Sequence, residues 1–322
     1  MKPLRFGIMP YYGAWEQPLD KWIKTAKETE KQGYSTIFQS DHFYKETLDP
    51  ITMLTTAANH TTNLNIGTLV LDIDYRHPAI LAKTAATLHL LSKGRFELGI
   101  GAGWDEKEYN WTGIPFDKPI TRIRRLEEAV QVIKDMLSME QSSFDGKHYH
   151  INDIPRAATL EDGDYPKIMI GGGGKQVLSV AGKYADIIGI HFQMSQRARA
   201  DRKRLVESMS FDGVNRKIGY VLDAAESVGR DVSEIEFMIL SRYLKIGDDV
   251  SEYVDWICNR FGVSVSGLNL DENAWMLVGS IEDVRDKIVR TRKETGVSYF
   301  VIGPEEKSLF KLFAEGVIKP LS

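Results

Sequence analysis

The stretch KIMIGGGGKQVLSVAGKYADIIGIH, residues 167–191, contains the structural unit that repeats along the chain. An apolar run at 168–170 leads into four glycines, then into a segment of helical pattern, and then into a second apolar run at 187–190. Short apolar runs joined by a helix are typical of a parallel sheet. Four consecutive glycines are costly, because glycine loses more backbone freedom on folding than any other residue. The stretch predicts a β–α–β unit whose first loop requires side chains to be absent.

The same alternation of strand and helix runs through the rest of the chain. Apolar stripes at helical spacing, such as that of Leu19, Trp22 and Ala26, separate the predicted strands. Eight strands that are each followed by a helix predict a (β/α)8 barrel, the TIM barrel of the α/β class. A doubly wound open sheet stays as the alternative, because it has the same alternation. The eight predicted strands lie at 5–9, 36–39, 64–70, 95–100, 167–170, 186–190, 234–240 and 298–302.

Two segments interrupt the alternation. The polar segment 140–166 contains SFDGKHYHI, in which Asp145-Gly146 between alternating residues predicts a β-hairpin. The segment 191–215 contains QRARADRKR, a basic run typical of a solvated helix face, although an acidic cofactor tail is an alternative partner. We expect a single barrel domain over residues 1–322, with insertions near 140–166 and 191–215.

Composition excludes several classes of protein. The 322 residues carry a net charge of -4, whereas nucleic-acid-binding domains are usually basic. The single cysteine, Cys258, excludes an intrachain disulfide and fits a reducing compartment. No secretory signal is recognised, and no run approaches the roughly 18 apolar residues that span a bilayer. We therefore expect a cytoplasmic protein with no membrane or nucleic-acid partner.

Candidate functional residues gather after the predicted strands, where the active sites of barrels lie. His42 follows the second strand directly and is adjacent to the carboxylate of Asp41. Such a pair suits a proton donor or acceptor that is oriented by its neighbour, although an ordinary hydrogen-bonded loop histidine is the alternative. His148 and His150 have no evident third ligand, so we expect no metal site.

The four glycines Gly171, Gly172, Gly173 and Gly174 lie between a predicted strand and a predicted helix. The first N–H groups of a helix and the positive end of its dipole form a site for anions. Without side chains, a phosphate group can approach the main chain there. The alternative is a tight loop in which glycine supplies a positive φ.

Four stretches of the chain together resemble the luciferase-like monooxygenase superfamily, and within it the branch of deazaflavin (coenzyme F420)-dependent oxidoreductases. The resemblance covers nearly the whole chain and is specific for the superfamily, and less so for the cofactor. It implies a decorated barrel that holds F420, or alternatively FMN, at the carboxyl ends of its strands. The stretches are SDHF at 40–43, NIGTLVLDIDYRHPAILAKTAATLHLLSKGRFELGIGAGWDEKEYNWTGIPF at 65–116, RIRRLEEAVQVIK at 122–134 and IMIGGGGKQVLSVAGKYAD at 168–186.

The resemblance also implies roles for individual residues. Asp41 and His42 match positions that contact the deazaflavin ring, with the histidine near its hydride-bearing face. The pair Leu69-Val70 matches a non-prolyl cis peptide that supports the ring. The remaining matches are cofactor contacts at Asp72, Ala102 and Gly103, and contacts to the phosphate end at Gly173, Gly174, Gln176 and Val177.

One residue departs from the pattern of the family. In sugar-6-phosphate dehydrogenases of this branch a catalytic glutamate follows the matching glycine, whereas Trp104 stands here. We therefore expect Trp104, together with His191, to line a flatter or more apolar substrate pocket. Packing of Trp104 within a lid is the alternative.

The function we expect is hydride transfer between F420 and a small organic substrate, with His42 exchanging the accompanying proton and Asp41 fixing the orientation of His42. An FMN-dependent luciferase-like monooxygenase is the first alternative, and a non-catalytic flavin-binding protein is the second. A barrel aldolase or isomerase would require a lysine or carboxylate pair at the strand ends, and none is convincing. A homodimer is expected by analogy with the family.

Overall fold

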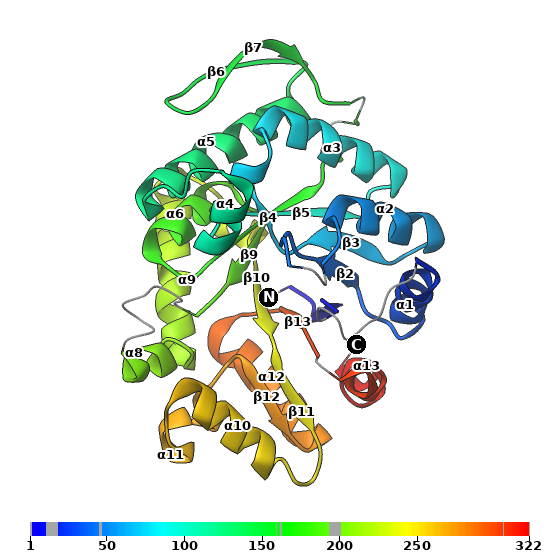
Figure 1. Cartoon of the computed structure of the whole chain (residues 1–322), viewed down its shortest axis with the longest axis vertical. Helices are drawn as coiled ribbons and strands as arrows, with labels where there is room; N and C mark the ends of the chain where they lie inside the picture. The colour runs from blue at the N-terminus through cyan, green and yellow to red at the C-terminus, as the bar shows by residue number, and fades with distance from the viewer. Residues whose placement is uncertain are drawn as a thin grey trace.

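The computed structural model of the chain describes residues 2–10, 19–44, 47–158, 160–161, 163–192, 201–304 and 306–321. Within this part, eight parallel strands form a barrel (Figure 1). Each barrel strand pairs with the next along the chain, and β13 pairs with β1, so the ring is closed. The predicted (β/α)8 barrel is confirmed, and the open sheet is wrong. The barrel strands are β1 (Arg5–Ile8), β2 (Thr36–Gln39), β3 (Asn65–Thr68), β5 (Phe96–Gly101), β8 (Lys167–Gly172), β9 (Ile187–Ile190), β10 (Glu236–Ser241) and β13 (Tyr299–Ile302).

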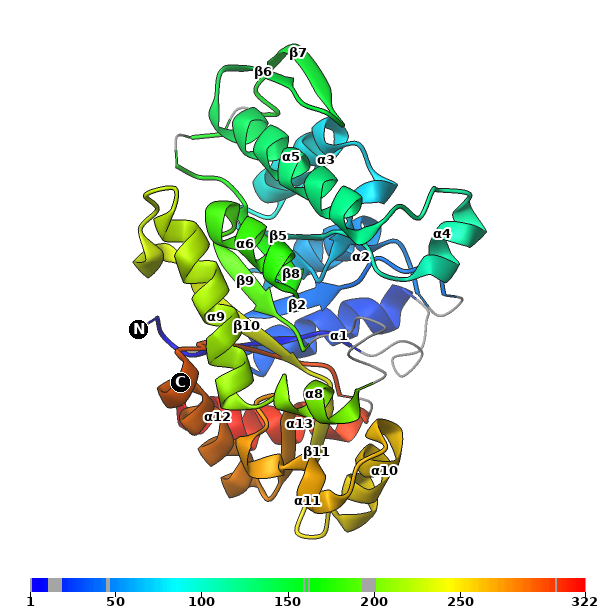
Figure 2. The ribbon, with the colours of Figure 1, turned by 90° about the vertical axis from the view of Figure 1, so that its left-hand side faces the viewer.

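A helix follows each barrel strand and covers the outside of the barrel (Figures 1 and 2). Three of these helices begin with proline, whose fixed φ suits the first turn and whose missing N–H has no intrahelical acceptor there. The apolar faces of the helices pack against the strands as the main core. These helices are α1 (Leu19–Lys31), α2 (Pro50–His60), α3 (Pro78–Leu91), α5 (Pro119–Ser138), α6 (Lys175–Tyr184), α9 (Phe211–Glu226), α12 (Ile281–Thr295) and α13 (Lys307–Phe313).

The hairpin indicated by Asp145-Gly146 is present as the antiparallel pair β6 (Gln141–Asp145) and β7 (His150–Pro155). Glu128 on α5 accepts the backbone N–H groups of Lys147, His148 and Tyr149 at 3.1, 2.7 and 3.2 Å, and so fixes the turn to the helix. Smaller elements complete the chain. They are β4 (Leu71–Asp72), η1 (Ile73–Tyr75), α4 (Glu106–Thr112), α8 (Arg202–Glu207), η2 (Val232–Glu234), η3 (Leu270–Glu272), η4 (Ala314–Ile318) and α14 (Lys319–Leu321).

One excursion was not expected from the sequence. Between β10 and α12 the chain forms a second, two-stranded parallel sheet of β11 (Tyr243–Ile246) and β12 (Met276–Gly279). The helices α10 (Ser251–Phe261) and α11 (Val265–Leu268) lie between these strands. This segment and the β6–β7 hairpin lie at opposite ends of the long axis of the molecule (Figures 1 and 2). Only Arg242 separates β10 from β11, and the strand predicted at 234–240 does not include β11.

The interior of the barrel has its own small core, separate from the core beneath the helices. Phe38 belongs to this core and is fully buried. A Cβ atom at Gly67 would lie 2.4 Å from the Phe38 ring, and one at Gly7 would lie 2.9 Å from it. These glycines therefore give the ring the space it occupies. A filled interior leaves the ends of the barrel as the places for a functional site.

In the part of the chain that the structure describes, no helix combines the length and the apolar character needed to cross a bilayer.

Candidate active site

Asp41 follows β2 at the carboxyl end of the barrel, and its carboxylate is buried. Arg76 donates to both of its oxygens, with Nη2 3.1 Å from Oδ1 and Nη1 on Oδ2. The N–H of Asp72 donates to the same carboxylate at 3.2 Å. The prediction that Asp41 fixes the orientation of His42 is wrong, because a backbone N–H of β4 and a side chain from the loop after it bind the Asp41 carboxylate instead.

Glu108 is the carboxylate that holds His42. Both of its oxygens lie 3.0 Å from Nδ1 of His42, and it also accepts the N–H of Phe43 at 2.8 Å and the hydroxyl of Tyr75 at 3.3 Å. The ring of Trp104 lies edge-on to His42, with 5.9 Å between the ring centroids. Sequence reasoning missed Glu108, although it forms the buried face of α4 together with Tyr109.

The peptide bond between Leu69 and Val70 is cis, as the resemblance implies. The side chain of Val70 lies among glycines of the neighbouring strands. A Cβ atom at Gly101 would lie 2.8 Å from a methyl group of Val70, and one at Gly171 would lie 3.4 Å from another. Gly101 is therefore needed for the packing of Val70 at the mouth of the barrel, whereas a Cβ atom on Gly171 would make only an ordinary contact with Val70.

Asp72 lies in a buried network that joins β4 to α4 and α5. Its Oδ2 accepts the hydroxyl of Tyr109 at 2.7 Å, and its Oδ1 accepts the N–H of Asp74 at 3.0 Å. Burial raises the pKa of Asp72 to about 7, and the nearby negative charges of Asp74 and Asp41 also raise it. The two hydrogen bonds that Asp72 accepts lower its pKa and offset part of this rise. Arg125 binds both oxygens of Asp74 at 2.8 Å.

Ala102 and Gly103 connect this network to the end of β5. Gly103 has a φ of 70°, and a Cβ atom there would lie 1.9 Å from the hydroxyl of Tyr109 and 2.3 Å from Asp72. A side chain at position 103 is therefore excluded by both conformation and space. The guanidinium of Arg122 donates to the carbonyl of Gly103 at 2.7 Å and so fixes the turn into α4.

The four glycines after β8 differ in what surrounds them. None of these four described residues has a positive φ, so the alternative of a left-handed loop is wrong. A Cβ atom added to Gly172 would lie 2.3 Å from the side chain of Val177, and one added to Gly173 would lie 2.7 Å from the carbonyl oxygen of His191. The protein itself fills those spaces. Gly174 alone among the four opens to free space, and it is the N-cap of α6.

A cavity of about 550 Å³ lies at this N-terminus of α6, between α8 and α9. The first N–H groups of α6 have no intrahelical acceptor and lie at the positive end of the helix dipole. Five basic and two acidic side chains line the cavity, which therefore favours an anion. They are Lys175, Lys203, Arg204, Arg216 and Lys217, and Asp201 and Glu207.

Lys217 is the buried cation of this cavity, with 5% of the residue exposed. Burial lowers its pKa to about 7, and the nearby Arg216 lowers it further. Its ammonium group donates to the carbonyl of Ser208 and lies 5.1 Å from the centre of the Trp275 ring. A bound anion would favour the charged form of this lysine.

His191 and Trp104, which were expected to line one substrate pocket, have different neighbours. Nδ1 of His191 donates to the carbonyl of Phe192 at 2.8 Å, and burial lowers the pKa of His191 to about 4. The backbone N–H of His191 donates to the carbonyl of Gly172, so His191 lies beside the four glycines. Trp104 lies beside His42 and is 58% exposed. Residues 11–18, which follow the first barrel strand, and residues 193–200 of the basic segment lie outside the described residues.

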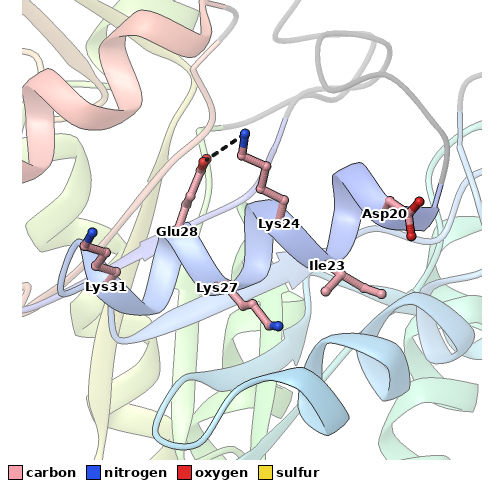
Figure 3. A pocket seen from close by; sticks show the side chains of 6 residues that line it. All are labelled: Asp20, Ile23, Lys24, Lys27, Glu28 and Lys31. Atoms are coloured by element: carbon pink, nitrogen blue, oxygen red, sulfur yellow. Dashed lines mark ion pairs between the residues drawn. The ribbon is translucent and has the colours of Figure 1, made fainter.

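A second hollow, of about 280 Å³, lies over the outer face of α1 (Figure 3). All six side chains that line it come from this one helix, and they include the exposed Lys27 and Lys31 and the ion pair of Lys24 with Glu28 at 3.9 Å. No strand end contributes to it, so we assign it no function.

A family model described as luciferase-like monooxygenase matches residues 3–266. The chain belongs to the luciferase-like monooxygenase family. This agrees with the resemblance read from the sequence. An F420-dependent glucose-6-phosphate dehydrogenase of Kineococcus radiotolerans is 32% identical over 194 residues, which are 58% of this chain and 56% of that protein. The chain thus spans about half the length of this relative.

Two further proteins match over nearly their whole length. A 5,10-methylenetetrahydromethanopterin reductase of Archaeoglobus fulgidus is 25% identical over 349 residues, which cover 99% of this chain and 100% of that protein. The solved structure of an F420-dependent secondary alcohol dehydrogenase, in complex with an F420-acetone adduct, has a TM-score of 0.78. It is 19% identical in sequence and covers 99% of both chains, so this likeness concerns the fold of the barrel.

Proposed function

We propose that the protein is an F420-dependent oxidoreductase that transfers a hydride between the deazaflavin and a small organic substrate. The observation that carries the proposal is the N-terminus of α6, where Gly174 opens onto a cavity rich in basic side chains. This end of the barrel also carries the pair of His42 and Glu108. The names of the similar proteins, several of which are F420-dependent, support the same cofactor.

The chemistry of the cavity fits an anionic cofactor. The first N–H groups of α6 would hold its phosphate, next to Gly174, Gln176 and Val177. Lys203 and Arg204, which belong to the basic run noted in the sequence, would bind an acidic tail. The residues proposed to contact the ring are His42, Asp41, Leu69, Val70, Asp72, Ala102 and Gly103. When bound, the deazaflavin supplies or accepts a hydrogen with two electrons.

His42 is the residue proposed to hold the accompanying proton. Reduction of a carbonyl group takes a hydride at carbon and a proton at oxygen, and oxidation of an alcohol releases both. Because Nδ1 of His42 faces the carboxylate of Glu108, the proton is exchanged at Nε2. A positioned acid or base of this kind typically contributes on the order of 10²- to 10⁴-fold in rate.

The substrate proposed is flat or apolar and is not a sugar phosphate. Trp104 stands where the resemblance expects a catalytic glutamate, and its exposed indole lies beside His42. The exposed indole of Trp104 next to His42 gives a substrate a surface on which to stack, but it cannot act as a base. Assay with glucose 6-phosphate and oxidised F420 should therefore give no turnover near the ordinary range of about 1 per second or faster.

The experiment that tests the cofactor is a titration of the purified protein with F420 and, separately, with FMN, followed by absorption and fluorescence. We expect saturable binding of F420 and weaker binding of FMN. Tight binding of FMN with none of F420 would favour the FMN-dependent monooxygenase, which the description of the family keeps as the second candidate. Binding of F420 without turnover of any acceptor would favour a non-catalytic flavin-binding protein.

By analogy with the family, we also propose that the protein is a homodimer. The outer face of α3 exposes Ile80 and Leu91, which are 64% and 56% exposed. Light scattering after size exclusion would give the mass of one chain if this proposal is wrong.

A further inference from the structure

Glu108 is a buried carboxylate to which sequence reasoning gave no role. The residue is only 2% exposed, and both oxygens lie 3.0 Å from Nδ1 of His42. An ionised carboxylate only accepts hydrogen bonds. The neutral imidazole ring of His42 must therefore carry its hydrogen on Nδ1, which leaves Nε2 as the nitrogen with a lone pair.

Glu108 is itself held in place on several sides. The N–H of Phe43 donates to Oε1 at 2.8 Å, and the hydroxyl of Tyr75 donates to Oε2 at 3.3 Å. The next residue, Tyr109, is fully buried and donates to Asp72 at 2.7 Å, which anchors α4 against β4. The carboxylate therefore has one orientation, and it imposes that orientation on the imidazole ring.

Two further carboxylates near His42, in the described part of the chain, have partners of their own. Asp41 binds Arg76 and the N–H of Asp72. Asp105 accepts the hydroxyl of Tyr44 and caps α4 through the N–H of Lys107 at 3.1 Å. Among the residues that the structure describes, Glu108 is thus the carboxylate in a position to select the tautomer of His42.

We propose that Glu108 is a positioning residue that keeps the hydrogen of neutral His42 on Nδ1, so that Nε2 exchanges the proton of the reaction. The inference rests on the proposed function of His42. In the oxidative direction, the proton of a substrate hydroxyl passes to Nε2 while the hydride on its carbon passes to oxidised F420. In the reductive direction, the ring would first be protonated and would give the proton on Nε2 to the substrate oxygen, while the substrate carbon would take the hydride that reduced F420 supplies. No atom or electron is left over in either direction.

The test is the variant Glu108→Gln, which keeps an oxygen for the N–H of Phe43 but also offers an N–H donor to Nδ1. The matched control is Glu128→Gln on α5. Glu128 also accepts backbone N–H groups, but it does so at the hairpin, away from His42. The tautomer is measured by ¹⁵N NMR of the ring nitrogens in the cofactor-free protein, at a pH at which the ring is neutral. The variant His42→Asn assigns the signals.

We expect the wild type and Glu128→Gln to carry the hydrogen on Nδ1, and Glu108→Gln to populate the Nε2–H tautomer. With reduced F420 and a nitroaromatic surrogate acceptor, kcat of Glu108→Gln should fall by about 10²- to 10⁴-fold, with F420 affinity and melting temperature near wild type. A wild-type ring with its hydrogen on Nε2 would overturn the proposal. Equal losses of kcat and of melting temperature in Glu108→Gln and Glu128→Gln would also overturn it, because they would show that Glu108 only stabilises the fold.

Failure of the proposed function would appear differently. In that case the wild type would neither bind nor oxidise reduced F420, whereas the NMR measurement would still decide the role of Glu108.

Discussion

The two ends of the barrel both bury charged side chains, but they use them differently. At the amino ends of the strands, Arg5 lies between Glu97 at 2.5 Å and Glu236 at 2.6 and 2.9 Å. The hydroxyl of Tyr299 donates to Glu97 at 3.1 Å, and Arg5 lies 3.6 Å from the centre of the Tyr299 ring. These groups all belong to barrel strands, so this network joins strands to one another.

At the carboxyl ends, each pair instead joins a strand end to a loop or helix. Arg76 reaches Asp41 from the loop after β4, and Glu108 reaches His42 from α4. The ring of Trp104 lies beside His42, and after β8 the open Gly174 begins α6. The difference teaches that the charges at the amino end join barrel strands to one another, whereas those at the carboxyl end fix groups from loops and helices, which we propose face a ligand.

The largest effect is expected from Arg5→Met, which leaves Glu97 and Glu236 buried without their cation. Loss of one partner from a buried ion cluster costs about 3–5 kcal/mol of the free energy of unfolding. Urea unfolding measures it, and F420 affinity of the folded variant should stay near wild type. The control is Lys24→Met, in the exposed pair shown in Figure 3, with an expected cost of about 0–0.5 kcal/mol. Equal costs for the two variants would contradict this view of the amino end.

His42→Ala tests whether a side chain at the carboxyl end of the barrel serves the reaction and not the stability of the fold. Turnover should fall by about 10²- to 10⁴-fold, because the positioned acid or base is lost, while F420 affinity and stability change much less. Steady-state assays with the surrogate acceptor and a binding titration measure the two effects. A variant that turns over at the wild-type rate across pH would show that His42 only packs against the ring.

Substitution at Gly174 tests the anion site with less effect on the fold. Asp and Asn are both good N-caps and have open space there, so Gly174→Asp and Gly174→Asn should both fold. F420 affinity of the Asp variant should be about 10- to 100-fold lower than that of the Asn variant, because its charge repels a phosphate. Gly173→Val is unsuitable, since its side chain would meet the carbonyls of His191 and Phe192. Equal affinities of the Asp and Asn variants would place the phosphate elsewhere.

The smallest expected effect is a pH dependence that arises from Lys217. In the free protein its pKa is lowered to about 7, so it loses its charge as the pH rises through 7. An anion binds best to the charged form, so F420 affinity is full below pH 7 and should fall by about tenfold toward pH 8.5. Lys217→Met should abolish this slope, whereas Lys203→Met, whose side chain is 89% exposed in the wild type, should keep it. An identical pH dependence of F420 affinity in Lys217→Met would show that Lys217 does not cause it.

The barrel could be predicted from the sequence because each strand is a short apolar run with clear ends. The strand at 36–39 has the predicted bounds, and the others differ by at most two residues at either end. β11 was not predicted: the predicted strand at 234–240 ends before it, and only Arg242 separates it from β10. The connection between β10 and β11 is too short to mark two separate strands in the sequence.

The positions of the candidate site residues could be predicted, but their partners could not. Adjacency in sequence suggested Asp41 as the partner of His42, whereas Glu108 lies 66 residues away. A glutamate or a lysine within a polar helical pattern reads as solvent-exposed, and this hid both Glu108 on α4 and Lys217 on α9. Only the packing of the helices shows which of their charges are buried.

The most direct measurement of the central claim is a crystal structure of the protein with F420 bound. The account predicts the phosphate on the N–H groups that follow Gly174, with the ring between Val70 and His42 and the tail toward Lys203 and Arg204. Contradiction would come from a ring bound away from His42, or from a phosphate bound outside the cavity between α6, α8 and α9.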